Sequence, residues 1–186
     1  MSAPILISRK NGADYFRLEK LSPAAVLTDF SCPIEEYNEY LIQDALRSQN
    51  DHVALTWLLR ERSSKGIVAY MSIINDAIRL SVSEKELHNL NYPFKTIPAM
   101  KIAKLAISLS SREKYKGVGS FMIDAAINLA LECNTDYSAC RFLTVDADIE
   151  NNESVLSFYE KNGFIQNSEM NNKNRKTISM RKDIFA

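Results

Sequence analysis

The stretch that decides the fold runs from residue 111 to residue 130 and reads SREKYKGVGSFMIDAAINLA. It follows an apolar run at 100–109 that is typical of a buried strand, and its second half carries apolar residues at helical spacing. Two of the chain's five glycines, Gly117 and Gly119, stand between these two patterns. The sequence therefore predicts a strand, a glycine-bearing loop and a helix in this order.

Such a loop is a physically suitable site for an anion. The first backbone N–H groups of a helix have no acceptor within the helix, and the helix dipole adds partial positive charge there. Glycines let a bulky diphosphate approach the backbone, and Arg112, Lys114 and Lys116 add positive charge. The pattern lacks the Gly-Lys-Ser/Thr of a P-loop and the third glycine of the dinucleotide fingerprint. A plain strand-to-helix turn with solvated lysines is therefore the alternative.

Length and composition indicate one ordinary globular domain. The 186 residues are 46% hydrophobic, which suits one well-buried core, and 23 basic residues balance 23 acidic ones. Balanced charge gives no overall basic bias of the kind that nucleic-acid-binding proteins often carry. Since the sequence shows neither a signal-peptide pattern nor the roughly 20 apolar residues of a membrane span, we expect a cytoplasmic protein with no membrane partner.

Cysteine and histidine spacing gives no sign of a metal site. Cys32, Cys133 and Cys140 are an odd number at spacings that match no zinc pattern, and both histidines lie far from any cysteine pair. We therefore expect free, reduced thiols and no structural metal.

The remaining segments predict a mixed sheet flanked by helices. From Pro33 onward, apolar residues at spacings of three and four indicate an amphipathic helix. Residues 91–100 contain Pro93 and Pro98 and are expected to be irregular. Strands are predicted at 14–21, 52–61, 66–74, 100–109, 139–147, 164–170 and 176–184, and helices at 33–50, 81–90, 118–133 and 151–164. The fold class is therefore α/β, in the α+β sense of a mixed sheet.

A second motif, NNESVLSFYEKNGF, occupies residues 151–164. Asn152 and Tyr159 are seven residues apart, or two helical turns, so both would lie on one face of a helix that Gly163 ends. A tyrosine hydroxyl held near a leaving group can act as a general acid. The alternative is that Tyr159 packs against the sheet with its hydroxyl at the rim.

Taken together, the two motifs resemble those of the GCN5-related N-acetyltransferase (GNAT) superfamily. Its loop pattern Gln/Arg-x-x-Gly-x-Gly/Ala matches 114–119, where Lys114 departs from glutamine or arginine. Its pattern Asn-x-x-Ala-x-x-x-Tyr-Glu-Lys-x-Gly-Phe matches 152–164, where Val155 departs from alanine. The resemblance, which covers about residues 100–165 by motif, implies a single N-acetyltransferase domain over 1–186. It also implies a mostly antiparallel sheet whose fourth and fifth strands, 100–109 and 140–146, are parallel and splay apart.

The resemblance further implies acetyl-CoA as the co-substrate, with no metal. Main-chain groups of Leu105, Ala106 and Ile107 would pair with the pantetheine arm, and Asn152 would support it. Tyr159 would be the catalytic residue that protonates the departing CoA thiolate. The pyrophosphate would be held, mainly through backbone amides, by the loop residues Lys114, Tyr115, Lys116, Gly117, Val118, Gly119 and Ser120.

The implied reaction is direct attack of a neutral primary amine on the thioester, with a strand N–H polarising the carbonyl. No general base is evident, since the candidates His52, Glu61, Asp146 and Asp148 all have plainer roles as surface or strand-end residues. A small polyamine or amino acid, a protein amino group and aminoacyl-tRNA all stay open as acceptors. The alternative from another class is a non-catalytic acyl-CoA-binding module, which would not need Tyr159.

Two further segments are similar to toxin-type acetyltransferases: DFSCPIEEYNEYLIQDAL at 29–46 and IPAMKIAKLAI at 97–107. Such toxins acetylate the amino group of aminoacyl-tRNA and need a basic surface. Basic residues concentrate here at 101–116, where CoA phosphates would explain them, and at 173–182, where a solvated hairpin would. tRNA is therefore an open but not the favoured partner, and an edge strand within 165–182 leaves a homodimer open.

Overall fold

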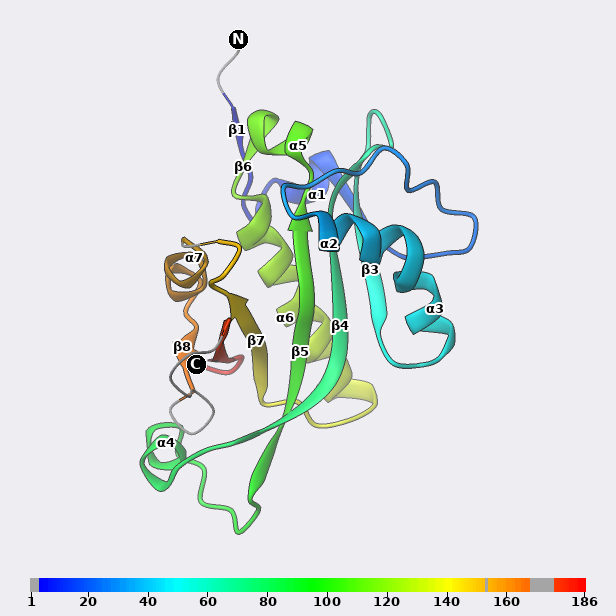
Figure 1. The fold of residues 1–186 in the computed structure, drawn as a ribbon. Coiled ribbons are helices and arrows are strands. Elements are labelled where there is room, and N and C mark those ends of the chain that lie inside the picture. Colours follow the sequence, from blue (N-terminus) through cyan, green and yellow to red (C-terminus); the bar gives the residue numbers. More distant parts are fainter. Residues whose placement is uncertain (1–3, 153, 168–175) are drawn as a thin grey trace. The chain divides into compact units, whose positions relative to one another are not determined.

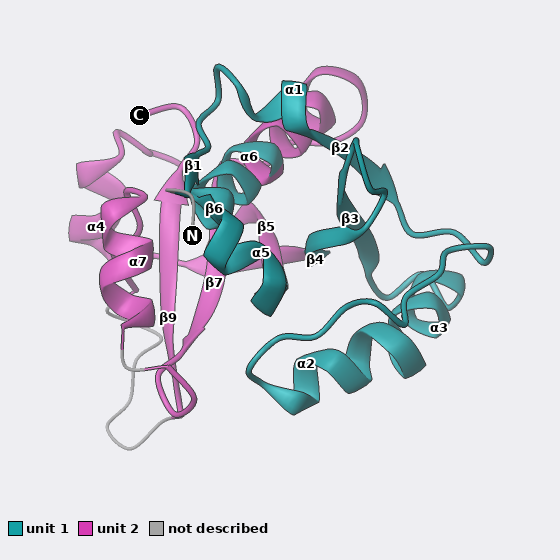
Figure 2. Cartoon of the chain, turned by 90° about the horizontal axis from the view of Figure 1, so that it is seen from above, with its two compact units in different colours: residues 1–74, 103–125 teal, residues 75–102, 126–186 magenta. Residues whose placement is uncertain are grey.

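The computed structural model describes residues 4–152, 154–167 and 176–186. The chain divides into two compact units, the first made of residues 1–74 and 103–125 and the second of 75–102 and 126–186 (Figure 2). Strands β4 (Ile67–Arg79) and β5 (Thr96–Ile107) and helix α6 (Val118–Asp136) each run from one unit into the other.

Seven strands form a sheet in the order β2-β3-β4-β5-β7-β9-β8 (Figure 1). Strand β5 runs parallel to β7, with Ala99–Ile102 opposite Phe142–Val145. The pairs β2–β3, β3–β4, β7–β9 and β8–β9 are antiparallel. Besides β4 and β5, the sheet consists of β2 (Phe16–Lys20), β3 (Leu55–Glu61), β7 (Phe142–Asp148), β8 (Ile165–Gln166) and β9 (Thr177–Asp183). A mixed, mostly antiparallel sheet is thus confirmed, whereas the splaying of its parallel strands stays a prediction.

The predicted amphipathic helix is present in the first unit and contains a π turn. It consists of α2 (Glu35–Glu39), the π-helical η1 (Tyr40–Asp44) and α3 (Ala45–Asn50) without a break. Pro33 precedes the helix, which begins after Ile34. The helix buries Leu41 and Ala45, which are spaced by four residues as the pattern requires.

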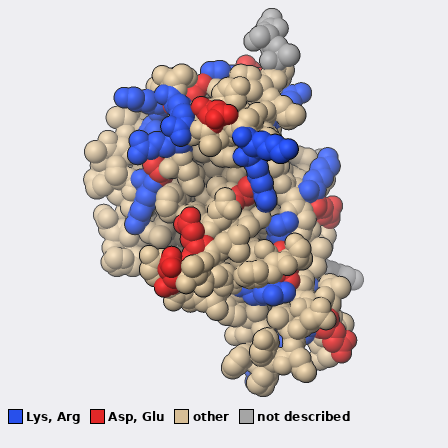
Figure 3. Space-filling model, turned by 180° about the vertical axis from the view of Figure 1, so that it is seen from behind, with Lys and Arg blue, Asp and Glu red and all other residues tan. Residues whose placement is uncertain are grey.

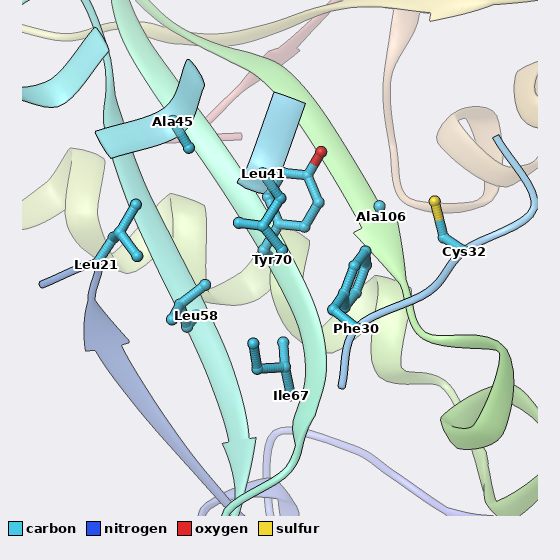
Figure 4. Packing of buried hydrophobic residues seen from close by; sticks show 9 residues of the cluster. All are labelled: Leu21, Phe30, Cys32, Leu41, Ala45, Leu58, Ile67, Tyr70 and Ala106. Atoms are coloured by element: carbon cyan, nitrogen blue, oxygen red, sulfur yellow. The ribbon is translucent and has the colours of Figure 1, made fainter. Parts of the chain in front are cut away.

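The core of the first unit explains the segment at 29–46. Phe30, Cys32 and Leu41 all lie in one buried cluster that also contains Tyr70 (Figure 4). The buried Asn38 side chain fixes the entry to the helix, because it accepts the Cys32 N–H at 2.8 Å and donates to the Cys32 carbonyl at 3.0 Å. The segment 29–46 therefore contributes buried side chains to the core of the first unit.

A buried ionic network distinguishes the second unit. Arg181 of β9 is only 1% exposed, and its guanidinium donates to Glu84 and to Asn167, both at 2.8 Å. Lys182 donates to the Asn162 carbonyl at 2.9 Å, and Lys176 pairs with Glu150 at 2.8 Å. The interpretation of 173–182 as a solvated basic hairpin is therefore wrong for Arg181, which is inside the fold; residues 173–175 lie outside the described residues.

Two sequence expectations need correction. Residues 96–100 were predicted to be irregular but form the first part of β5, in which the Pro98 carbonyl accepts the Arg141 N–H at 2.9 Å. The predicted strand at 100–109 ends at Ile107, and the segment predicted as a loop contains α5 (Leu109–Lys114) and β6 (Tyr115–Lys116). Strand β6 pairs in parallel with β1 (Ile5–Leu6), an element that the sequence pattern did not reveal.

The shorter helices complete the description. Helix α4 (Val82–Leu87) begins with a capping box in which Ser81 and Glu84 bond each other's backbone N–H, as a serine cap predicts. Helix α1 (Gly12–Tyr15) directly precedes β2 in the chain, and α7 (Val155–Lys161) lies between β7 and β8. No helix among the described residues combines the length and apolarity needed to cross a membrane.

The three cysteines are free thiols, as expected. Burial raises the pKa of Cys32, and it raises that of Cys140 to about 11, so both stay protonated at neutral pH. Within the described part of the chain, no three metal-ligating side chains come together.

Candidate functional site

The glycine-bearing segment leads directly into the first turn of α6, as the sequence predicts. The first N–H donation of that helix runs from Phe121 to the Gly117 carbonyl at 3.0 Å. The amides of Val118, Gly119 and Ser120 precede it and so have no acceptor within the helix. A helix of 19 residues places its positive dipole end at these amides, which suits a phosphate group.

Gly117 is required by the N-terminal segment of the chain. Its φ is +90°, and a Cβ at this position would collide with the carbonyl oxygen of Ile7. The Ile7 N–H donates to the Lys116 carbonyl at 2.7 Å, which extends the pairing of β1 with β6. The sequence argument attributed this glycine to the approach of a diphosphate, whereas the structure gives it an intramolecular reason.

The same N-terminal segment also packs on the start of α6. Gly12 lies against the ring of Phe121 so closely that a Cβ would overlap it. Arg9 forms an ion pair with Asp124 one turn further along the helix. Residues 5–12 therefore fix the position of the first turns of α6 from one side, a role that the sequence pattern did not indicate.

A carboxylate from β3 fixes the other end of the loop. Glu61 accepts from the Lys114 ammonium at 2.5 Å, from the Ser64 hydroxyl at 2.6 Å and from the Tyr115 hydroxyl. These donors, with Lys114 the largest influence, hold the pKa of Glu61 at about 2, while the pKa of Lys114 is raised. The carboxylate is therefore ionised and engaged, which makes Glu61 a poor general base.

The strand segment 105–107 is anchored at its end. Ala106 is buried in the core of the first unit, while Leu105 and Ile107 are half-buried. The next amide, that of Ser108, donates to the Val68 carbonyl of β4 at 2.9 Å, and the amide of Leu109 donates to Ser31 at 2.8 Å. These contacts give the predicted pantetheine-binding run a fixed position relative to β4.

Tyr159 is held by the way α7 ends. The Phe164 N–H donates to the Tyr159 carbonyl at 3.0 Å and the Gly163 N–H to the Glu160 carbonyl at 2.9 Å, which is the Schellman pattern. Gly163 has φ +81°, and the Phe164 ring contacts Tyr159 with a centroid distance of 5.3 Å. The predicted helix end at Gly163 is confirmed, and it leaves Tyr159 only 8% exposed.

Asn152 does not share a helical face with Tyr159, because α7 begins at Val155. It is an exposed turn residue whose side-chain oxygen accepts from the Ser154 amide at 3.1 Å and from the Ser154 hydroxyl at 2.8 Å. The spacing argument assumed that the helix began at the asparagines. The local role of Asn152 is instead to shape the turn before α7.

The predicted site residues fall into two groups. The first unit brings together Leu105–Ile107 and all the loop residues from Lys114 to Ser120. Asn152 and Tyr159 belong to the second unit.

The other candidate bases have structural roles of their own. Asp146 pairs with Lys101 at 2.6 Å, and Asp148 accepts the Asn151 N–H at 3.1 Å. His52 is exposed and has φ +58° in the turn before β3. The geometry thus singles out none of them as a base.

The first basic cluster, at 101–116, is partly neutralised. Lys101, Lys104 and Lys114 form ion pairs with Asp146, Glu36 and Glu61 respectively. Arg112 and Lys116 are exposed beside the loop. Figure 3 shows one face of the protein, on which acidic side chains lie among the basic ones.

Comparison with known proteins supports the fold. No protein-family model matches the chain, and no curated protein sequence matches it. A structure of AtaT in complex with acetyl-methionyl-tRNAfMet is 21% identical, with a TM-score of 0.72 over 88% of this chain and 93% of AtaT. A tyrosine-to-phenylalanine mutant of KacT is 18% identical, with a TM-score of 0.72 over 90% of this chain and 95% of KacT.

A third structure, AtaTR bound with acetyl-CoA, is 21% identical with a TM-score of 0.69 over 90% of this chain and 94% of the other. Identities this low show a shared fold. The fold that the motif resemblance implies is therefore confirmed.

Proposed function

We propose that this chain is an acetyl-CoA-dependent N-acetyltransferase that transfers an acetyl group to a primary amine. The observation that carries the proposal is the start of α6, which follows β5 by way of α5 and β6 and has three backbone amides ahead of its first helical hydrogen bond. The resemblance of both motifs and the shared fold with AtaTR bound with acetyl-CoA support it. Acetyl-CoA supplies an activated acetyl thioester.

In this proposal the loop and the strand bind the co-substrate. The amides from Lys116 to Ser120 hold the pyrophosphate. Hydrogen bonds from backbone N–H groups to a charged phosphate are stronger than those to a neutral acceptor. Arg112 and Lys116 add exposed positive charge, whereas Lys114 is already engaged by Glu61. Main-chain groups of Leu105–Ile107 pair with the pantetheine arm, and one N–H polarises the thioester carbonyl.

Tyr159 is proposed to donate a proton to the departing thiolate. Its position is fixed by the Schellman turn at Gly163 and by the flanking rings of Phe158 and Phe164. A fixed hydroxyl loses little entropy when it donates, which favours general acid catalysis. Asn152 supports the pantetheine side from the turn before α7.

A second, narrower candidate for the acceptor is the amino group of an aminoacyl-tRNA. The shared fold with AtaT, solved with acetyl-methionyl-tRNAfMet, favours it over other macromolecular amines. The balanced charge of the chain argues for a limited phosphate contact rather than a broad basic surface.

Thiol release from acetyl-CoA with a panel of amines, including a small monoamine, a peptide and an aminoacyl-tRNA, tests the proposal. Tyr159→Phe should lower turnover by about 10²-fold or more with little change in acetyl-CoA affinity, as loss of a general acid does. Tyr137→Phe is the matched control, because Tyr137 is 86% exposed in the turn directly after α6. Intact acetyl-CoA binding without thiol release for any amine would favour the non-catalytic binding module.

A further inference from the structure

Lys104, the residue before the run 105–107 on β5, is enclosed by groups that bind cations. Its Nζ lies 2.7 Å from a carboxylate oxygen of Glu36, 4.5 Å from the ring centroid of Tyr37 and 5.4 Å from that of Tyr40. Its side chain is only 19% exposed. We call Glu36, Tyr37 and Tyr40 the cation cage.

The cage is fixed to the core of the first unit. The Tyr70 hydroxyl donates to the Tyr37 carbonyl at 2.8 Å, and the Tyr40 ring stacks on Tyr70 with a centroid distance of 6.4 Å. Tyr37 and Tyr40 stand on either side of the boundary where α2 passes into the π turn. Such turns are frequent at functional sites because they reposition side chains within a helix. The two aromatic members of the cage are therefore tied to the core, while the carboxylate member, Glu36, has a side chain that is 70% exposed.

Two aromatic faces and a carboxylate are the groups with which proteins bind ammonium ligands. Here the ammonium comes from the chain itself. Side chains alternate along a strand, so Lys104 shares the face of Ala106, and its Cα lies about 3.3 Å along the strand from that of Leu105. The filled cage therefore borders the segment that we propose to hold the thioester.

Resting on the proposed acetyl transfer, we propose that Lys104 is a specificity-determining residue whose ammonium occupies the cation cage and disfavours acceptors that carry a second positive charge. A polyamine would have to bring its second charge close to Lys104, which like-charge repulsion opposes, or displace Lys104 from the cage, which would cost the ion pair with Glu36 and both ring contacts. An amine whose remaining groups are neutral or anionic meets no such cost. Among the open acceptor classes, the cage thus disfavours polyamines and lysine-rich peptides.

The experiment compares kcat/KM for phenylalaninamide, which has one amino group, with that for spermidine, which has three. The wild-type protein should strongly prefer phenylalaninamide. Lys104→Met removes the charge but keeps the volume, and Lys104→Ala also opens the cage; both should raise kcat/KM for spermidine by about tenfold or more relative to phenylalaninamide. The matched control is Lys101→Met on the same strand, which should leave the ratio unchanged because Lys101, three residues away, projects from the opposite face of the strand and contacts Asp146 rather than the cage.

A calorimetric titration with spermidine measures binding directly and does not depend on activity. Lys104→Ala should bind spermidine in the vacated cage, and the wild-type protein should not. The inference is overturned if the wild-type protein acetylates both amines equally, if Lys104→Met lowers both activities in parallel, or if wild type and Lys104→Ala bind spermidine alike. Absence of transfer to every amine would refute the proposed function instead, and the titration would still test the cage.

Discussion

The Nζ atom of Lys114 lies 2.5 Å from Oε1 of Glu61, so the first position of the glycine loop is tied to the end of β3. In the loop pattern that the sequence resembles, this position carries glutamine or arginine. The structure gives the lysine a protein partner, and the same carboxylate also accepts from Tyr115 in the next position. The pair therefore holds the loop in place, and in the proposed function phosphate binding rests on the backbone amides beyond it.

Lys114→Met should consequently leave acetyl-CoA binding almost unchanged, with a Kd less than about threefold higher, because its ammonium is engaged elsewhere. Its cost in stability should be below about 1 kcal/mol, since the lysine side chain is 53% exposed. Glu61→Ala should cost about 2 kcal/mol or more, because it leaves three donors without their acceptor. Urea unfolding and acetyl-CoA titration of both variants test this; a tenfold weaker binding of acetyl-CoA by Lys114→Met would refute it.

The pH dependence of stability should carry the signature of Glu61. Its pKa is about 2 in the folded chain against an ordinary value of 4.5, so the unfolded state binds more protons between these values. The stabilising contribution of the carboxylate is therefore complete above about pH 4.5 and is lost as the pH falls toward 2. Unfolding free energies of wild type and Glu61→Gln should differ by a constant amount from pH 5 to 7 and converge below about pH 4. A difference that does not change with pH would contradict the assignment.

Gly117→Ala should separate β1 from β6. A left-handed conformation costs an alanine about 1–2 kcal/mol, and the overlap with the Ile7 carbonyl adds to that cost. We expect a loss of stability of at least about 2 kcal/mol together with weaker acetyl-CoA binding, because the start of α6 shifts. Gly66→Ala is the control, since its nearest neighbour, the Ser64 hydroxyl, would lie 3.3 Å from the new Cβ and its φ is ordinary. Equal stabilities of the two variants would count against this role.

Local patterns in the sequence identified the elements that carry their own signals. The serine cap of α4 and the glycine end of α7 are short-range features, and the structure contains both. The prediction that Asn152 and Tyr159 share a helical face was wrong. A spacing of seven residues places two side chains on one face only inside a helix, and α7 begins at Val155. Boundaries of short helices depend on turns that periodicity does not describe.

Non-local partners were beyond reach from the sequence. Strand β1 has two residues and pairs with a segment more than 100 residues away, so no period marks it. Lys114 and Glu61 are likewise 53 positions apart. The run containing Arg181 has the composition of a solvated basic hairpin, and only the contact of Arg181 with Glu84 in the structure shows its buried role. Tertiary pairing decides such roles, which is why the cation cage around Lys104 was also missed.

Arg181→Met should be one of the most damaging single substitutions in the second unit. Removing one partner of a buried ion pair typically costs about 3–5 kcal/mol, because the remaining charge stays buried without compensation. Glu84 would lose this partner while its side chain remains only 11% exposed. The control is Arg9→Met, which breaks an ion pair whose arginine side chain is 68% exposed and should cost less than about 1 kcal/mol. Urea unfolding at pH 7 separates the two cases, and comparable losses would argue against a structural network around Arg181.

Substitution of Gly163 tests whether the Schellman turn positions Tyr159. Gly163→Ala must adopt φ near +81°, which costs about 1–2 kcal/mol, whereas Gly163→Asn tolerates this region better. The Lys182 ammonium, the nearest neighbour of a new Cβ, is the end of a flexible side chain and can move aside. If the turn fixes the tyrosine, Gly163→Ala should lower kcat more than it weakens acetyl-CoA binding, and Gly163→Asn should retain most of the activity. Steady-state kinetics and acetyl-CoA titration measure both effects. A Gly163→Ala variant that is less stable but has unchanged kcat would show that the proton donor does not depend on this turn.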